Sequence, residues 1–417
     1  MQTRLCNKTK KNYLRKLNRK IVESFFRTHK YLVEHLGSTV ERRLMDEVNW
    51  NDRLIAVKGT RGVGKTTFLL QYAAKFSDLD GRDCLYINMN NFSFTCRTIY
   101  DFAEEFCFKG GKTLLIDQVF KYPDWASELR SCYDKFPELK IIFTCSTVMQ
   151  LDENPEIASI VRHYNLRGFS FREFLNIITD SKLEPVSLPD IINNHTEIAA
   201  EICSKVKPLA YFRDYIHHGY YPFFLEKRNF SENLLKTINM MLEIDVLSIK
   251  QIEQSYLSKL RKLLYLLSIT APGKPNISQL SVDCEISRAT VTNYLDYLKS
   301  ARLINLLYRE GEEFPKKPDL VYMHNTNLIF AMKPGVANDQ TLRETFFYNQ
   351  LHHNNSKLKK GSKAGIFLVE DENENYIFKV DNLKTKGNKK SDIYNTAEMM
   401  EVGEGNTIPL WLFGFLY

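Results

Sequence analysis

The sequence predicts an α/β fold whose core is a parallel sheet covered by helices on both faces, with mainly helical and then mixed parts downstream. Two observations predict this core. A glycine-rich loop, residues 59–67, lies between an apolar strand-like run and a run with helical apolar spacing. Beyond it, strand-like and helical runs alternate as far as about residue 167. The length of 417 residues favours two or three domains.

The glycine-rich loop matches the pattern G-x-x-x-x-G-K-[ST] at all four fixed positions. Its residues are Gly59, Thr60, Arg61, Gly62, Val63, Gly64, Lys65, Thr66 and Thr67. The glycines allow a tight turn that aims backbone N–H groups at phosphates, and the N-terminus of the following helix adds partial positive charge. Lys65 can reach the β- and γ-phosphates, and the Thr66 hydroxyl can ligate Mg²⁺. We therefore expect the loop to bind a nucleoside triphosphate with Mg²⁺.

The alternating runs predict five strands and place a carboxylate at the end of the third. The expected strands are residues 53–57, 84–89, 113–116, 140–143 and 163–166. Asp117 follows the third strand, at the edge of the sheet where it can hold Mg²⁺ through water while Thr66 holds it directly. An Asp at this position could equally cap the next helix, but the neighbouring phosphate loop favours the metal role.

Gln118 follows Asp117 and bears on catalysis. Many ATPases of this type have a Glu here, which orients and deprotonates the attacking water. An amide can position water but is a far weaker base. The sequence leaves three explanations open: hydrolysis is slow, the base comes from elsewhere, or Gln118 is an engineered replacement that preserves binding.

The fourth expected strand ends in hydroxyl residues, where a γ-phosphate would lie. Thr144 or Ser146 could contact that phosphate, or both could be ordinary loop hydroxyls. We take Lys65, Asp117, Gln118 and Thr144 as the candidate catalytic residues. An arginine finger could come from one of three arginines, among which sequence spacing does not choose: Arg162, Arg167 and Arg172.

Composition places the chain among ordinary globular proteins. The eight cysteines include no C-x-x-C pair, which favours reduced thiols and a cytoplasmic location. No apolar run reaches membrane-spanning length.

Residues 1–30 carry ten Lys or Arg and the single acid Glu23, with apolar residues spaced for an amphipathic helix. A solvated helix face is the favoured interpretation, and an arm for nucleic acid is the alternative.

Residues 169–258 are predicted to be mainly helical, and residues 259–324 resemble a winged helix-turn-helix. Ser170 and Glu173 have the spacing of a capping box. In the winged-helix segment, Ser287 is expected to cap a recognition helix, and residues 303–308 and 320–323 to form the wing. The candidate DNA contacts are Arg288, Thr292 and Asn293 for bases and Arg302, Arg309, Lys316 and Lys317 for phosphates. Such modules also serve as packing or protein-binding surfaces.

Several blocks together resemble the bacterial and archaeal AAA-type ATPases that carry a C-terminal domain of unknown function related to restriction-endonuclease folds. These blocks are residues 59–67, 115–125, 143–147, 166–175 and the chain end 408–417. The resemblance implies an additional-strand P-loop NTPase core and a C-terminal α+β endonuclease-like domain, to which the residue pattern adds a helical lid and a winged helix. It also implies ATP rather than GTP, and Mg²⁺. Gln118 departs from the family's usual acid.

The predicted division has five parts: a basic helical segment 1–50, the ATPase core 51–168, the lid 169–258, the winged helix 259–324 and the endonuclease-like domain 325–417. A nuclease of this kind needs two carboxylates for Mg²⁺ and a lysine. Glu344 matches the helix acid, but Lys379 occupies a position where the family tends to have an acid, and Asp381 is out of phase. We therefore expect this domain to be inactive.

The sequence as a whole predicts a Mg-ATP-binding AAA-type ATPase, slow in turnover, whose nucleotide state acts as a switch coupled to the winged-helix segment. The alternative is a DNA-binding or nuclease-related module in which ATP is structural. DNA and further copies of the chain are candidate partners, and no membrane partner is expected.

Overall fold

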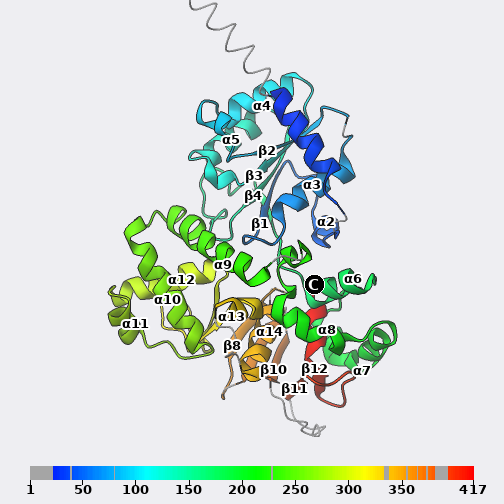
Figure 1. Ribbon diagram of the computed structural model, residues 1–417, viewed down its shortest axis with the longest axis vertical. Helices are drawn as coiled ribbons and strands as arrows, with labels where there is room; N and C mark the ends of the chain where they lie inside the picture. The colour runs from blue at the N-terminus through cyan, green and yellow to red at the C-terminus, as the bar shows by residue number, and fades with distance from the viewer. Residues whose placement is uncertain are drawn as a thin grey trace, which may run out of the picture. The chain divides into compact units, whose positions relative to one another are not determined.

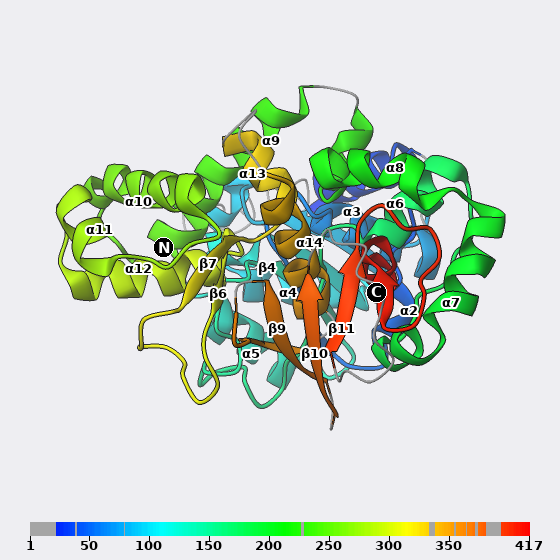
Figure 2. The same cartoon turned by 90° about the horizontal axis from the view of Figure 1, so that it is seen from below.

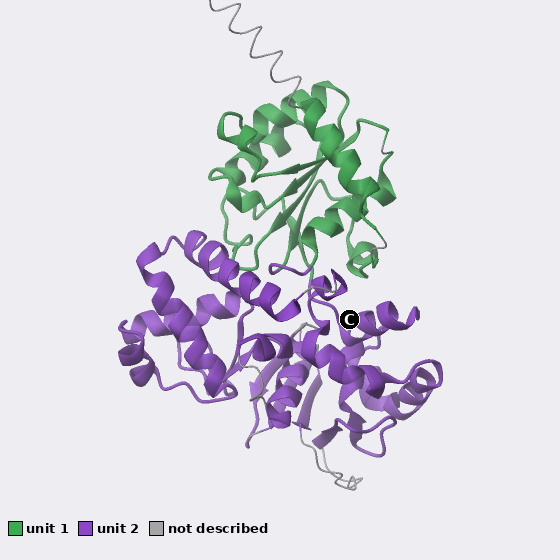
Figure 3. Cartoon of the chain, in the orientation of Figure 1, with its two compact units in different colours: residues 1–59, 64–166 green, residues 60–63, 167–417 purple. Residues whose placement is uncertain are grey.

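The computed structural model (Figure 1) describes residues 22–37, 40–78, 80–226, 229–332, 338–353, 356–363, 365–371, 374–380 and 393–417. The chain forms two compact units, one of residues 1–59 and 64–166 and one of residues 60–63 and 167–417 (Figure 3). Most of the basic segment expected at the N-terminus, residues 1–21, lies outside the described residues. The five-part division stays a prediction.

The first unit contains a five-stranded parallel sheet with the strand order β2-β3-β4-β1-β5. Its strands are β1 (Leu54–Lys58), β2 (Cys84–Asn88), β3 (Thr113–Asp117), β4 (Lys140–Cys145) and β5 (Arg162–Asn165). The first four bury at least four residues each, as expected for parallel strands covered on both faces. This confirms the α/β fold. Strand β4 lies between β1 and β3, in agreement with an additional-strand core.

Helices cover both faces of this sheet, with α3 on the opposite side from α4 and α5 (Figure 1). The helical elements of the unit are α2 (Leu44–Glu47), α3 (Lys65–Phe76), η1 (Phe92–Thr95), α4 (Ile99–Phe108), η2 (Val119–Lys121) and α5 (Trp125–Lys135). The Thr98 hydroxyl accepts a hydrogen bond from the Asp101 N–H and so caps α4.

The sequence pattern over residues 24–48 also looks helical, but the N-terminal helix of the described residues is shorter than this run. Residues 22–34 are helical, and Gly37 then adopts a left-handed φ of 69° before the short helix α2. Phe25, one of the apolar residues at helical spacing in this segment, is buried, and its ring lies 5.2 Å from Phe102 and 5.7 Å from Phe94. This helix therefore packs on the first unit through its apolar side.

The second unit begins with a run of helices. They are α6 (Phe171–Thr179), α7 (Leu188–Lys205), α8 (Pro208–Asp214), η3 (Tyr215–Gly219), η4 (Pro222–Glu226), α9 (Phe230–Met240), η5 (Met241–Ser248) and η6 (Gln254–Tyr256). The capping box predicted at Ser170 and Glu173 is present in both directions. The elements η3 and η5 are π-helical.

The helices and the strand pair expected over residues 259–324 are present. They are α10 (Leu257–Thr270), α11 (Ile277–Asp283), α12 (Arg288–Ser300), β6 (Ile304–Leu307) and β7 (Leu320–Met323), the last two antiparallel. Ser287 caps α12 as expected. The winged-helix assignment itself stays a prediction. Arg302 is half-buried beside Tyr220 and Tyr417, and burial lowers its pKa. Its expected role as a phosphate contact stays a prediction.

The unit ends in a five-stranded mixed sheet with the order β12-β11-β10-β9-β8, alongside α14 (Figure 2). The elements are α13 (Thr326–Met332), α14 (Asp339–His353), β8 (Lys357–Lys360), β9 (Ile366–Asp371), β10 (Glu374–Val380), β11 (Ile393–Ala397), β12 (Thr407–Pro409) and η7 (Leu410–Phe415). Phe347 of α14 packs against Phe378 and Phe413 with ring centroids 5.3 and 4.9 Å away. An aromatic core thus joins helix, sheet and chain end.

Candidate nucleotide-binding site

The glycine-rich loop leads from β1 into α3, as its sequence context predicts. The Gly59 N–H donates to the Cys145 carbonyl at 3.2 Å, which fixes the start of the loop against β4. Gly62 and Gly64 have φ values of 80° and 94°, in the left-handed region that favours glycine. Gly64 is the N-cap residue of α3, so the loop ends at the N-terminus of a helix. That position suits an anion.

The loop lysine lies over the loop itself. The Lys65 Nζ donates to the Gly59 carbonyl at 2.8 Å. A lysine in this position carries its positive charge across the turn, where phosphate oxygens would meet it. The Lys65 side chain thus folds back onto the loop, and its expected role in phosphate binding stays a prediction.

Residues 60–63, at the crest of the loop, belong to the second unit. Arg61 forms a bidentate ion pair with Asp245 of η5, with Nε–Oδ2 and NH2–Oδ1 distances of 3.0 and 3.1 Å. Both side chains are largely buried. A Cβ on Gly62 would approach the Phe223 ring to 2.9 Å, so a larger residue here would have to displace that ring and adopt a left-handed φ.

Asp117, at the end of β3, is buried and accepts hydrogen bonds from four side chains. The donors are the Thr66 hydroxyl at 2.9 Å, the Tyr86 hydroxyl at 2.9 Å, the Asn88 amide at 3.1 Å and the Thr144 hydroxyl at 2.5 Å. These donors lie on α3, β2 and β4. In the sheet, β2 and β4 are the two neighbours of β3, so their carboxyl ends lie beside Asp117. The carboxylate is therefore fixed next to the first turn of α3.

Tyr86 and Asn88 are not among the site residues that the sequence predicts, yet both contact Asp117. Burial raises the pKa of the Tyr86 hydroxyl, and the charge of Asp117 raises it further, so this group stays protonated and donates. The polar residues at the carboxyl end of β2 could have indicated these contacts, because neighbouring parallel strands end at the same edge of a sheet. This inference requires knowing that β2 pairs with β3, which the sequence alone does not show.

Gln118 is half-buried and adopts a left-handed φ of 56° directly after β3. Its backbone N–H donates to the Thr144 hydroxyl at 2.8 Å, and its side-chain oxygen accepts from the Asn90 amide at 3.0 Å. The Thr144 hydroxyl thus joins Asp117 and Gln118. Ser146 is buried, and its hydroxyl accepts from the Val148 N–H at 3.3 Å.

The oxygen atoms of Thr66 and Asp117 suit a hard cation such as Mg²⁺, which prefers oxygen ligands. Because the two groups are hydrogen-bonded, their oxygens lie close enough to face a common ion or its water shell. Within the described part of the chain, no group of three or more His, Cys, Asp or Glu residues could hold a metal by itself. A metal here would thus depend on phosphate and water oxygens as further ligands.

Of the three candidate arginine fingers, Arg162 is exposed on β5. Arg167 lies with its guanidinium 5.3 Å from the centre of the Tyr417 ring. Arg172 is buried and donates to the Tyr417 and Leu183 carbonyls at 3.1 and 3.2 Å. These contacts give Arg172 a structural role at the chain end.

Of the two acids considered in the C-terminal part, only Glu344 lies among the described residues. Glu344 is buried on α14, where it accepts from the Tyr322 hydroxyl at 2.8 Å and the Gln340 amide at 2.7 Å. Burial raises the pKa of Glu344. Lys379 lies on β10, and Asp381 lies outside the described residues.

No helix in the described ranges is both long and apolar enough to cross a bilayer. A family model described as an AAA domain matches residues 51–175, and one described as a domain of unknown function (DUF8612) matches residues 209–326. The chain is also 27% identical over 282 residues to the uncharacterized protein MJ1637 of Methanocaldococcus jannaschii. That alignment covers 64% of this chain and 59% of the relative. Residues 51–175 are therefore similar to an AAA domain, of the P-loop ATPase-like kind.

Proposed function

We propose that the chain is a Mg-ATP-binding AAA-type ATPase with slow turnover. The observation that carries the proposal is the contact of Thr66 with Asp117, which joins the phosphate loop to the carboxylate at the end of β3. The AAA-domain match over residues 51–175 and the order of the parallel strands support the same function.

In this proposal each site residue has one role. Lys65 neutralises charge on the β- and γ-phosphates, and Thr66 and Asp117 hold the metal ion. Bound Mg²⁺ would supply charge neutralisation on the phosphates. Gln118, held by Asn90, positions water together with the Thr144 hydroxyl. Because an amide is a weak base, turnover is slow and the nucleotide acts as a switch.

The switch proposal extends to the remaining parts of the chain. The predicted lid 169–258 and winged helix 259–324 would respond to the bound nucleotide, and the α+β part 325–417 would be an inactive endonuclease-like domain. The free cysteines among the described residues support a cytoplasmic location. The proposal also includes the assembly of several copies of the chain into a homo-oligomer.

Displacement of a fluorescent ATP analogue tests the proposed binding. We expect Lys65→Ala to lose ATP binding, because it removes the charge that lies over the loop. Lys75→Ala, at the other end of the same helix and with a half-exposed side chain, is the matched control and should bind as the unmodified chain does. Unchanged affinity in Lys65→Ala would reject the proposal.

DNA binding through residues 259–324 is a second candidate function. Arg288 and Asn293 are exposed on α12, and Lys316 and Lys317 are exposed between β6 and β7. Basic side chains on a helix and its neighbouring hairpin can contact phosphates and a groove. Fluorescence anisotropy with duplex DNA should show affinity that falls steeply with salt, and no binding at low salt would remove this candidate.

A further inference from the structure

The second unit contains a cavity of about 270 Å³. Its walls are mainly apolar: Phe212, Ile216, Phe330, Leu342 and Leu410. Arg213, Arg343 and Glu398 also line it, and Asp214 and His217 lie at its exposed rim. The volume is just below the range of about 300–1,000 Å³ of typical ligand pockets, so it suits a small molecule.

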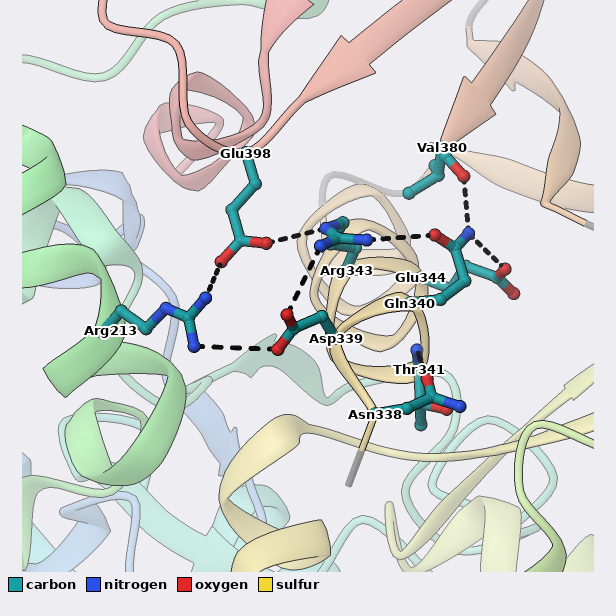
Figure 4. A network of polar contacts seen from close by, with 9 residues as sticks. All are labelled: Arg213, Asn338, Asp339, Gln340, Thr341, Arg343, Glu344, Val380 and Glu398. Atoms are coloured by element: carbon teal, nitrogen blue, oxygen red, sulfur yellow. Dashed lines mark hydrogen bonds and ion pairs between the residues drawn. The ribbon is translucent and has the colours of Figure 1, made fainter. Parts of the chain in front are cut away.

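Two of the lining arginines belong to a closed ring of alternating charges (Figure 4). Glu398 contacts Arg343 Nε at 2.7 Å and Arg213 NH2 at 3.3 Å. Asp339 lies 3.7 Å from Arg213 NH1 and 3.7 Å from Arg343 NH2. The ring joins α8, the first two turns of α14 and the residue that follows β11.

The two carboxylates of the ring are held very differently. Glu398 is buried, with its side chain 10% exposed, and its contact with Arg343 is a hydrogen bond. Asp339 is 53% exposed, and both of its contacts are longer than a hydrogen bond. Water screens such an exposed pair strongly. Asp339 is therefore the member of the ring that a competing anion can replace.

The Arg343 guanidinium has an N–H group that can donate a hydrogen bond to such an anion. Its Nε donates to Glu398, and its NH1 donates to the Gln340 side-chain oxygen at 3.3 Å (Figure 4). Its NH2 group faces Asp339 beyond hydrogen-bond distance, as does the Arg213 NH1 group. The planar guanidinium fork matches a carboxylate better than any other common anion except phosphate.

We propose that this cavity binds a small carboxylate with an apolar body. The carboxylate replaces Asp339 between the guanidinium groups of Arg213 and Arg343. The apolar part fills the space between Phe212, Leu342 and Phe330. Glu398 stays in place and orients Arg343. This ligand site is distinct from the nucleotide site and does not depend on ATP binding.

Isothermal titration calorimetry of the full chain with hexanoate tests the proposal, with hexanamide as the neutral probe of the same shape. We expect saturable binding of hexanoate and at least tenfold weaker binding of hexanamide, because a hydrogen bond to a charged group is lost. Arg213→Gln should weaken hexanoate binding at least tenfold, whereas Asp339→Asn should strengthen it by removing the competing carboxylate.

The variants are chosen so that folding does not decide the result. Arg213 and Asp339 are both more than half exposed, and Lys205→Gln, on the exposed face of α7, serves as a control that should bind hexanoate normally. Absence of saturable hexanoate binding overturns the proposal. So does equal affinity for hexanamide, or weaker hexanoate binding in Asp339→Asn than in the unmodified chain.

Discussion

The Thr66 hydroxyl donates a hydrogen bond of 2.9 Å to the carboxylate of Asp117. The residue that follows the loop lysine and the residue that ends β3 are thus in direct contact, although 51 positions separate them. The two oxygen-bearing side chains expected to face a metal ion lie together. The start of α3 and the end of β3 are therefore held together by a direct side-chain contact.

Replacing Gln118 tests what limits turnover. Gln118→Glu keeps the side-chain oxygen that accepts from Asn90 and adds a base. General-base catalysis contributes about 10²- to 10⁴-fold, so we expect phosphate release to rise at least tenfold. Gln118→Ala, which adds no base, should show no rise. A rate for Gln118→Glu equal to that of the unmodified chain would mean that another feature limits hydrolysis.

Tyr86 should stabilise the first unit through Asp117. Tyr86→Phe removes one of the four donors to this buried carboxylate, and a hydrogen bond to a charged group is worth about 2 kcal/mol. We expect thermal unfolding of the variant to begin at a lower temperature. The control Tyr31→Phe changes an exposed ring and should leave the unfolding temperature unchanged. Equal stability of the two variants would contradict the role given to Tyr86.

The ion pair of Arg61 and Asp245 should hold the crest of the loop. Asp245→Ala leaves the Arg61 charge buried without its carboxylate, and breaking a buried pair costs about 3 kcal/mol. The double variant Arg61→Met with Asp245→Leu should recover much of the loss, because it removes both charges. Differential scanning calorimetry measures both variants. If the double variant is as unstable as Asp245→Ala, the pair is not what stabilises the crest.

Stability of the second unit should fall in mild acid because of His324. This imidazole is buried against Asn305, and burial lowers its pKa well below the ordinary value, with the charge of Arg302 contributing. Below about pH 6.5 the unfolded chain takes up a proton that the folded chain does not, so the free energy of unfolding decreases. The melting temperature should therefore drop between about pH 7.5 and about pH 5.5.

His324→Gln removes the titrating group and should reduce this dependence on pH. The exposed His35 provides the control, because His35→Gln should leave the dependence of the melting temperature on pH unchanged. A slope that is the same in His324→Gln as in the unmodified chain would assign the effect to other groups.

Local pattern was sufficient to predict the strands and the glycine-rich loop of the first unit. The loop lies between a buried strand and a helix, Asp117 ends β3, and each expected strand lies within two residues of an observed one. The capping box at Ser170 is likewise a local signal, because its donor and acceptor are three residues apart. Spacing and apolar runs carry this kind of information directly.

Partners that lie far apart in the chain were not predictable. Arg61 and Asp245 are 184 positions apart, and nothing in their surrounding sequence indicates a pair. Tyr86 reaches Asp117 only because β2 pairs with β3, which depends on the strand order. Arg302 reads as a surface phosphate contact in sequence, yet its surroundings are Tyr220 and Tyr417. Tertiary packing determines the partners and the burial of these residues.

The measurement that tests the central claim most directly is calorimetric titration of the unmodified chain with ATP, once with excess Mg²⁺ and once with EDTA. We expect saturable binding with Mg²⁺ that weakens at least tenfold in EDTA, and loss of this metal dependence in Asp117→Asn. Absence of ATP binding in the presence of Mg²⁺ would contradict the account.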